Sequence, residues 1–197
     1  MGPATARLGV LIAVALLFAG FAPSATARGR GKGGHGHGHG HGGPAHGGPV
    51  NPLVAGICLH TPFPEVCKLT AGRHAAKYHV IDNQAVLNMQ VDAFAKRTAA
   101  ARKFVARASR KGSPAQTQAL TFCDTMYMNT QDTIGAAQRA ITFKDKGTAK
   151  IMLQLAVQDF QSCDHPFQQA SIPNPMLKID GELNQMANNC MQLASMM

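Results

Sequence analysis

Apolar residues recur every three or four positions through most of the chain after residue 73, which is the spacing of amphipathic helices. The first long run spans about residues 73–111, the second 114–141, the third 149–164, and the last follows Pro175 to the C-terminus. Their apolar stripes consist of Ile81, Ala85, Met89, Phe94, Ala101, Val105 and Ala108; Leu120, Cys123, Tyr127, Ile134, Ala137 and Ile141; Met152, Ala156, Phe160 and Cys163; and Ile179, Leu183, Met186, Cys190 and Leu193. Four such helices with short connections predict an all-α fold, an antiparallel up-down-up-down four-helix bundle.

The segments between these runs contain residues that end and start helices. Gly112, Ser113 and Pro114 supply a C-cap, an N-cap and a first helical residue in succession. Residues 142–148 are predicted to form a connecting loop, and Pro166 ends the third run.

A smaller helical unit is predicted ahead of the four runs. Residues 52–60 can form a short helix, residues 61–64 break it, and Pro64 suits the first turn of a second short helix that carries Cys67. If the two segments fold back on each other as a helical hairpin, Cys58 and Cys67 come close together. Cys123 and Cys163 would likewise lie level in an antiparallel pair of long helices. Cys190 remains, and its place on an apolar stripe predicts a buried free thiol.

The first 27 residues have the organisation of a secretory signal peptide. Arg7 precedes an apolar run from Leu8 to Phe21, and the small residues Ala25 and Ala27 follow, so we expect cleavage after Ala27. The run of about 14 residues is short of the roughly 20 that span a bilayer. The sequence therefore predicts a secreted, extracellular protein without a membrane span, in a compartment where disulfides persist.

Residues 28–50 are dominated by glycine and contain alternating histidines. With almost no apolar side chains to bury, this segment is predicted to be a disordered tail. Its histidines can chelate divalent metals, although nothing preorganises a closed site. The candidate metal ligands are His35, His37, His39, His41 and His46. A structural or metal-binding wall protein that acts through this tail is one hypothesis for function.

The whole sequence has a formal net charge of +9, and removal of Arg7 with the signal peptide lowers it to +8. A basic secreted protein is attracted to polyanions, such as acidic pectin in a plant cell wall or an acidic protein surface. Aromatic residues are sparse and no recognition motif for DNA occurs, so a nucleic-acid partner is not expected.

An enzymatic function is not predicted. His60, His74, His79 and His165 are scattered, and no serine, cysteine or carboxylate is paired with a plausible base. His74 and His79 are five residues apart, which does not match the i, i+4 spacing of helix-borne metal ligands. No cofactor is expected.

Three segments resemble the plant invertase and pectin methylesterase inhibitor family. Residues 57–67 (ICLHTPFPEVC) are similar to its opening motif, in which a Thr-Pro-aromatic-Pro turn lies between two cysteines. Residues 119–127 (ALTFCDTMY) and 159–163 (DFQSC) resemble the segments around its third and fourth cysteines. The resemblance covers residues 51–197, and a free cysteine in the last helix also recurs in the family.

The resemblance implies a four-helix bundle with an N-terminal helical hairpin and the disulfides Cys58–Cys67 and Cys123–Cys163. It also implies a protein that blocks a pectin methylesterase, or alternatively a cell-wall or vacuolar invertase, in a one-to-one complex. Both targets use active-site carboxylates, toward which a basic inhibitor would be steered.

The resemblance does not select between the two targets. Invertase-type members carry a Pro-Lys-Phe motif between the second and third long helices, where residues 141–147 here read ITFKDKG. The esterase type often has Thr-Asn before an acidic Asp-Thr-Cys sequence, of which residues 158–163 (QDFQSC) keep little. We take an esterase as the leading target. From the family architecture, the candidate partner-binding residues are Phe143, Lys144, Lys146 and Gln158.

Overall fold

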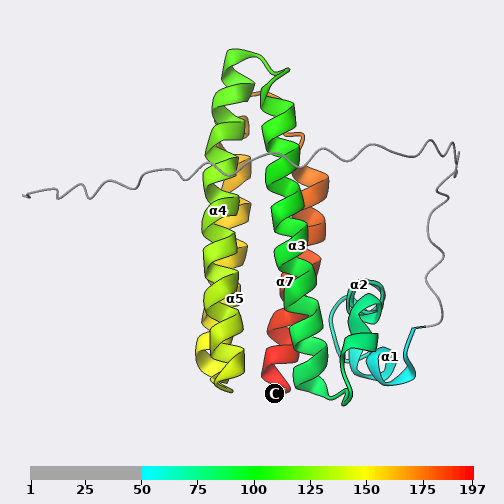
Figure 1. The fold of residues 1–197 in the computed structure, drawn as a ribbon. Coiled ribbons are helices and arrows are strands. Elements are labelled where there is room, and N and C mark those ends of the chain that lie inside the picture. Colours follow the sequence, from blue (N-terminus) through cyan, green and yellow to red (C-terminus); the bar gives the residue numbers. More distant parts are fainter. Residues whose placement is uncertain (1–49) are drawn as a thin grey trace, which may run out of the picture. The chain divides into compact units, whose positions relative to one another are not determined.

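The computed structural model describes residues 50–197, which are helical with no strand in that range. Four long helices form the body of the fold (Figure 1). The helices in chain order are α1 (Pro52–Cys58), α2 (Pro64–Ala71), the 3₁₀ helix η1 (Gly72–Lys77), α3 (Asn83–Ser109), α4 (Pro114–Thr142), α5 (Lys146–Gln161), the 3₁₀ helix η2 (Ser162–Asp164), α6 (His165–Gln169) and α7 (Leu177–Ser195).

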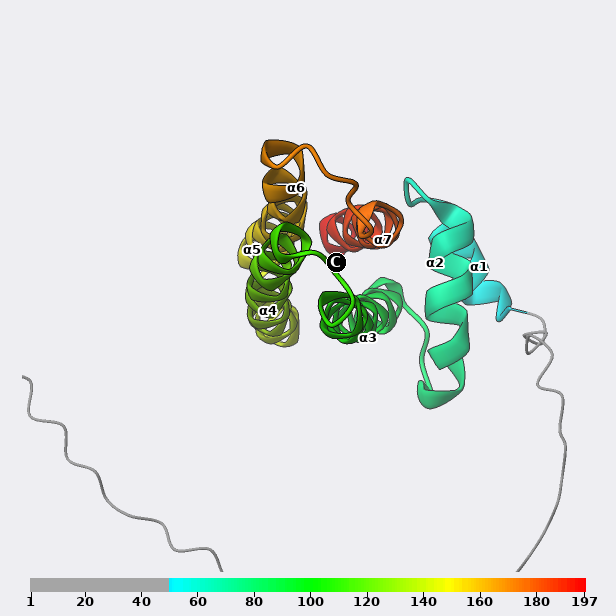
Figure 2. The same ribbon diagram turned by 90° about the horizontal axis from the view of Figure 1, so that it is seen from above.

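The long helices α3, α4, α5 and α7 run alternately up and down and occupy the four corners of the bundle when it is seen end-on (Figure 2). Their apolar stripes meet in one core. At its centre the rings of Phe94 from α3 and Phe160 from α5 pack edge to face, with centroids 6.3 Å apart. The predicted all-α bundle with its N-terminal helical hairpin is confirmed.

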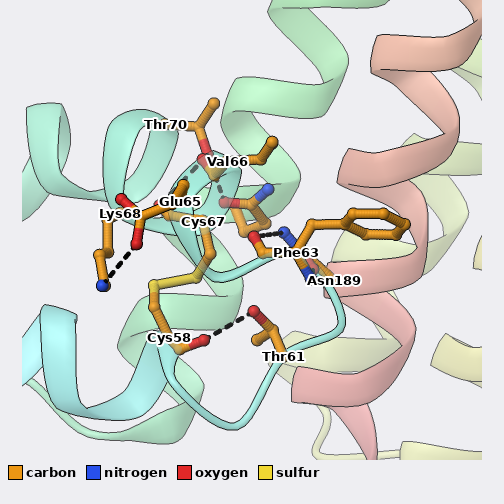
Figure 3. Close-up of a disulfide and its surroundings, with 10 residues drawn as sticks. Cys58, Thr61, Phe63, Glu65, Val66, Cys67, Lys68, Thr70 and Asn189 are labelled. Carbon is orange, nitrogen blue, oxygen red and sulfur yellow. Dashed lines mark hydrogen bonds and ion pairs between the residues drawn. A yellow bond between two sulfur atoms is a disulfide. The ribbon is translucent and has the colours of Figure 1, made fainter.

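The hairpin of α1 and α2 packs outside the bundle, against α3 and α7 (Figure 2). The Cys58–Cys67 disulfide joins its two helices across Cα atoms 5.5 Å apart. The Thr61 hydroxyl donates a hydrogen bond to the carbonyl of Cys58 at 2.8 Å and fixes the turn between them (Figure 3). A second disulfide, Cys123–Cys163, joins α4 to η2 across Cα atoms 4.6 Å apart.

The first long helix starts later than its apolar spacing predicts. Residues 72–77 form η1, Tyr78 is extended, and α3 begins only at Asn83. Asp82 is the physical reason, because its side chain accepts a hydrogen bond from the amide of Ala85 at 2.7 Å and caps the helix. Ile81 packs against the core from the segment before the helix.

The loop between α4 and α5 is shorter than the predicted span of residues 142–148. Helix α4 extends to Thr142, and α5 already begins at Lys146, where Asp145 caps it by accepting a hydrogen bond from the amide of Thr148. Three residues therefore turn the chain through the connection. The third run is also divided, because its predicted end at Asp164 lies in η2 rather than in α5.

Two expected features of the N-terminus lie outside the described residues. These are the signal peptide, and the tail up to residue 49 with its five candidate metal ligands. None of the helices between residues 50 and 197 has the length and apolar composition needed to cross a bilayer.

Candidate functional site

The tip of the α4–α5 connection has a tightly fixed backbone. The amide of Asp145 donates to the carbonyl of Ala140 at 2.9 Å, and the amide of Lys144 donates to that of Ile141 at 3.0 Å. This pair of bonds is a Schellman motif, which requires a left-handed residue after the helix. Lys144 occupies that position with φ of 57°. Glycine is the usual residue there, so a lysine holds the turn at a conformational cost.

The tip presents an aromatic ring and a lysine to solvent. The side chain of Phe143 is 81% exposed. Lys144 is also exposed and makes no salt bridge within residues 50–197. Lys146 is held differently, because its Nζ donates to the carbonyl of Ser195 at 2.9 Å and ties the loop to the end of α7. The structure therefore brings together three of the predicted partner-binding residues.

Gln158 lies at the opposite end of α5. It is 12 positions after Lys146, which corresponds to about 18 Å along a helix. Gln158 lines a surface hollow of about 580 Å³ together with Phe122 of α4 and Ser162 of η2. The four predicted residues thus mark the two ends of one helix rather than a compact cluster.

Exposed apolar side chains lie between those two ends. Ile151 and Leu155 are 56% and 41% exposed, and with Gln158 they follow i, i+4, i+7 spacing, so all three share one face of α5. Phe122, which is 41% exposed, lies beside that face in the hollow. We call the surface formed by Phe122, Phe143, Ile151, Leu155 and Gln158 the α4–α5 face.

Sequence reasoning missed Phe122, Ile151 and Leu155. The signal that could have found them is the occurrence of large apolar residues on the face of each helix opposite its core stripe. The Cys123–Cys163 bridge positions Phe122, since it holds the start of α4 against η2 next to the hollow. Both cysteines are fully buried, so the bridge supports this end of the face from beneath.

Most of the cationic side chains lie away from the α4–α5 face. They lie on α2, on η1 and along α3 to its C-cap: Lys68, Arg73, Lys77, Lys96, Arg97, Arg102, Lys103, Arg107 and Arg110. Arg102 is engaged within the fold, since its Nε and one terminal nitrogen donate to the two carboxylate oxygens of Asp124 at 2.8 and 3.0 Å. Close to the tip, Lys144, Lys146 and Lys150 supply the positive charge. The five residues that define the α4–α5 face carry no charge.

Within residues 50–197, no three side chains of His, Cys, Asp or Glu lie close enough together to hold a metal ion. One half-buried carboxylate, Asp180, has a strongly raised pKa. The Tyr127 hydroxyl donates a hydrogen bond to Asp180, and burial raises the pKa of Asp180 to about 6. This pair lies between α4 and the start of α7 inside the bundle, and it contributes to packing rather than to the α4–α5 face.

The fold is similar to solved structures of pectin methylesterase inhibitors. A mutant form of such an inhibitor from Arabidopsis superposes with a TM-score of 0.56 at 16% sequence identity, covering 73% of this chain and 96% of that one. An inhibitor from Arabidopsis thaliana superposes with a TM-score of 0.55 at 14% identity, covering 74% of this chain and 95% of that one. No curated protein matches the sequence closely enough to count as a relative.

The sequence itself matches the family described as plant invertase/pectin methylesterase inhibitor, over residues 52–195. This range contains the hairpin, all four long helices and both disulfides. The chain therefore belongs to the plant invertase/pectin methylesterase inhibitor family.

Proposed function

We propose that the protein is a secreted inhibitor that binds a plant cell-wall pectin methylesterase in a one-to-one complex and blocks it through the α4–α5 face. The observation that carries this proposal is the family match over the whole helical domain, since the family consists of inhibitors of two enzymes. Both similar structures are those of pectin methylesterase inhibitors, which supports the esterase as the target.

The chemistry of the α4–α5 face suits a protein partner. Exposed Phe143, Ile151 and Leu155 offer apolar area to bury, and Gln158 offers hydrogen bonds at the hollow. Interfaces of stable complexes combine such an apolar centre with a polar rim. Lys144 at the tip extends into solvent, where it can reach a carboxylate of an acidic cleft.

The rigid tip supports the same proposal. Its Schellman motif and the Asp145 cap fix the backbone on both sides of Phe143 and Lys144. A preorganised loop loses little conformational entropy on binding. Lys144 adopts a left-handed backbone conformation that favours glycine. A non-glycine residue at such a strained position supports a functional role for its side chain, here in partner binding.

The test is a titration of the oxidised chain beginning at Arg28 against a plant pectin methylesterase and a cell-wall invertase, at pH 5 and pH 7. Loss of esterase activity that ends at a one-to-one ratio, with invertase unaffected, is the expected result. Loss of invertase activity alone would assign the other target of the family. A shortened chain beginning at Asn51 should inhibit equally well, whereas dependence on the tail would assign the function to residues 28–50.

A further inference from the structure

A second surface depression lies on the opposite side of the bundle from the α4–α5 face. It has a volume of about 390 Å³ and is lined by residues of α2, η1, α3 and α7. Figure 2 shows α2 beside α3 and α7, on the side away from α4 and α5. We call the depression the α2 cleft. Its lining includes Val66, Arg73, Ala93, Lys96, Arg97 and Met186.

The interior of the α2 cleft is apolar. Val66 from α2 and Met186 from α7 contribute aliphatic side chains, and the small side chains of Ala93 and Ala100 on α3 leave space between the helices. Leu69 also lines the cleft, with 58% of its side chain still exposed to solvent. An apolar body placed here would cover that surface, which is favourable in proportion to the area removed from water.

The rim of the α2 cleft is cationic. Arg73, Lys96 and Arg97 all line it, and Glu182 is the one carboxylate among the lining residues in the described part of the chain. Glu182 forms a salt bridge with Arg97, while Arg73 and Lys96 form none within residues 50–197. The Nε of Arg97 is buried and has no hydrogen-bond partner there. The rim therefore has more positive charge than its own carboxylate balances.

His74, which also lines the cleft, reports the same imbalance. Burial is the largest cause that lowers the pKa of His74, followed by the cations Lys96 and Lys77; Asp92 opposes them, and Arg73 has the smallest lowering effect. A bound anion would reverse part of that shift. His74 is thus a built-in probe of charge inside the cleft.

We propose that the α2 cleft binds a small organic anion in which one carboxylate is joined to an apolar body of about the size of naphthalene. The carboxylate would lie between Arg73, Lys96 and Arg97, and the apolar body would cover Val66 and Met186. Guanidinium groups suit this role because they hold carboxylates in a planar, two-pronged geometry. The cleft volume is within the range of small-molecule sites, roughly 300–1,000 Å³.

This site is independent of the proposed inhibition, because it uses α2, α3 and α7 rather than the α4–α5 face. A polyuronate chain is an alternative ligand for the cationic rim. Its regularly spaced carboxylates would need a row of cations along a groove, whereas the α2 cleft combines a few cations with an apolar interior. An amphipathic anion therefore fits the α2 cleft better than a polyuronate chain does.

The experiment is an NMR titration of the oxidised chain beginning at Arg28 with 2-naphthoate, using the neutral 2-naphthamide as the matched ligand. We expect 2-naphthoate to saturate with a Kd on the order of 0.1–1 mM. We expect 2-naphthamide to bind at least about tenfold more weakly, since it lacks the charge. The His74 ring signal should titrate at higher pH when 2-naphthoate is bound.

The double variant Arg73→Gln/Lys96→Gln should weaken 2-naphthoate binding about tenfold or more. Both side chains are exposed on the rim, so the substitutions should not disturb the fold. An unchanged far-UV circular dichroism spectrum would verify that the helices are retained. The matched control is Arg110→Gln/Lys111→Gln, which removes the same charges at the end of α3, about 15 Å along the helix from Ala100. Glu182→Gln should tighten binding, because it releases Arg97.

Equal binding of 2-naphthoate and 2-naphthamide would overturn the proposal. So would equal weakening of 2-naphthoate binding by the rim and control variants, or a failure of 2-naphthoate to saturate the protein below about 10 mM. Saturation by a galacturonate oligomer but not by 2-naphthoate would assign the cleft to a polysaccharide instead.

Discussion

The side chain of Asn189 satisfies both backbone groups of Phe63, although 126 residues separate them. The amide of Phe63 donates to the Asn189 side-chain oxygen at 2.9 Å, and the Asn189 side-chain nitrogen donates to the Phe63 carbonyl at 2.9 Å (Figure 3). Asn189 is fully buried in α7, and Phe63 lies in the turn of the hairpin. One side chain thus fastens the hairpin to the bundle.

Replacing Asn189 with alanine should release the hairpin. Two backbone groups of Phe63 would lose their partners, and each unsatisfied buried group costs about 1–3 kcal/mol. We expect urea unfolding to show a loss of about 2–4 kcal/mol, with faster hydrogen exchange in α1 and α2 than in the long helices. Asn188→Ala is the control, because Asn188 bonds within its own helix to Asn184. Equal effects of the two variants would contradict this account.

Placing a charge on the α4–α5 face should abolish inhibition without unfolding the protein. Ile151→Arg puts a charged side chain where an apolar one is 56% exposed, so it costs little stability. A desolvated, unpaired charge at an interface weakens binding by several kcal/mol, or more than about a hundredfold. The inhibition constant against the esterase measures the effect. Leu53→Arg on α1, at a position 60% exposed, is the matched control and should inhibit normally.

Lys144→Gly should make the protein more stable and the inhibitor weaker. Glycine adopts the left-handed conformation of this position without strain, so stability should rise by about 0.5–1 kcal/mol. Loss of the lysine should at the same time slow association with an acidic partner. Thermal unfolding and stopped-flow binding give the two readings. A stabilised variant that associates at the wild-type rate would remove Lys144 from the site.

The two disulfides should contribute unequally to stability. The Cys123–Cys163 bridge spans 40 residues and Cys58–Cys67 spans 9. Loop-closure entropy then predicts about 4 and 2.6 kcal/mol respectively. Paired substitution of each bridge by alanine, followed by urea unfolding, tests the order. Removal of Cys123–Cys163 should also reduce inhibition, because that bridge holds Phe122 at the hollow. The reverse order of stability would contradict the entropic account.

Stability should decrease as the pH rises through the titration of Asp180. Burial raises its pKa to about 6 from the ordinary 3.8, the Tyr127 hydrogen bond opposes this, and Asp164 adds to it. The folded protein therefore binds more protons than the unfolded chain between about pH 4 and 6. The stabilising contribution of the protonated acid is complete below about pH 4 and is lost as the pH rises through 6, at most about 3 kcal/mol.

Asp180→Asn should flatten that part of the stability curve, measured by urea unfolding from pH 4 to 7. Asp132→Asn, a change at an exposed carboxylate on α4, is the control and should keep the wild-type dependence. If Asp180→Asn retains the full slope between pH 4 and 6, the titration belongs to another group.

The bundle could be predicted because local signals determine each helix. The second run is predicted at residues 114–141, and α4 spans Pro114–Thr142, since Ser113 caps it and Pro114 starts it. The predicted start of α3 is wrong because the apolar spacing continues through Ile81, in a segment that packs on the core without being part of α3. Asp82 is a residue type that caps helices, but apolar spacing alone does not distinguish a cap from a position inside a helix.

The candidate site was harder to predict than the fold. Periodicity identifies the buried face of α5, but it assigns no role to Ile151 and Leu155 on the opposite face. Gln158 is separated from Phe143 by most of the length of α5. The sequence alone predicts the start of that helix three residues too late, at residue 149 instead of Lys146. The contact of Asn189 with Phe63 could not be inferred, because a polar residue on an apolar stripe does not indicate its distant partner.

Cys190 lies fully buried on α7, and burial raises the pKa of its thiol well above the ordinary value. A thiol attacks disulfides as its thiolate, which requires both ionisation and access. In a chain whose last helix has not yet packed, we expect this sulfur to be accessible for exchange with either bridge. Packing of α7 removes that access, because Cys190 is fully buried in the folded chain. We therefore expect the packing of α7 to protect the native cysteine pairing from further exchange.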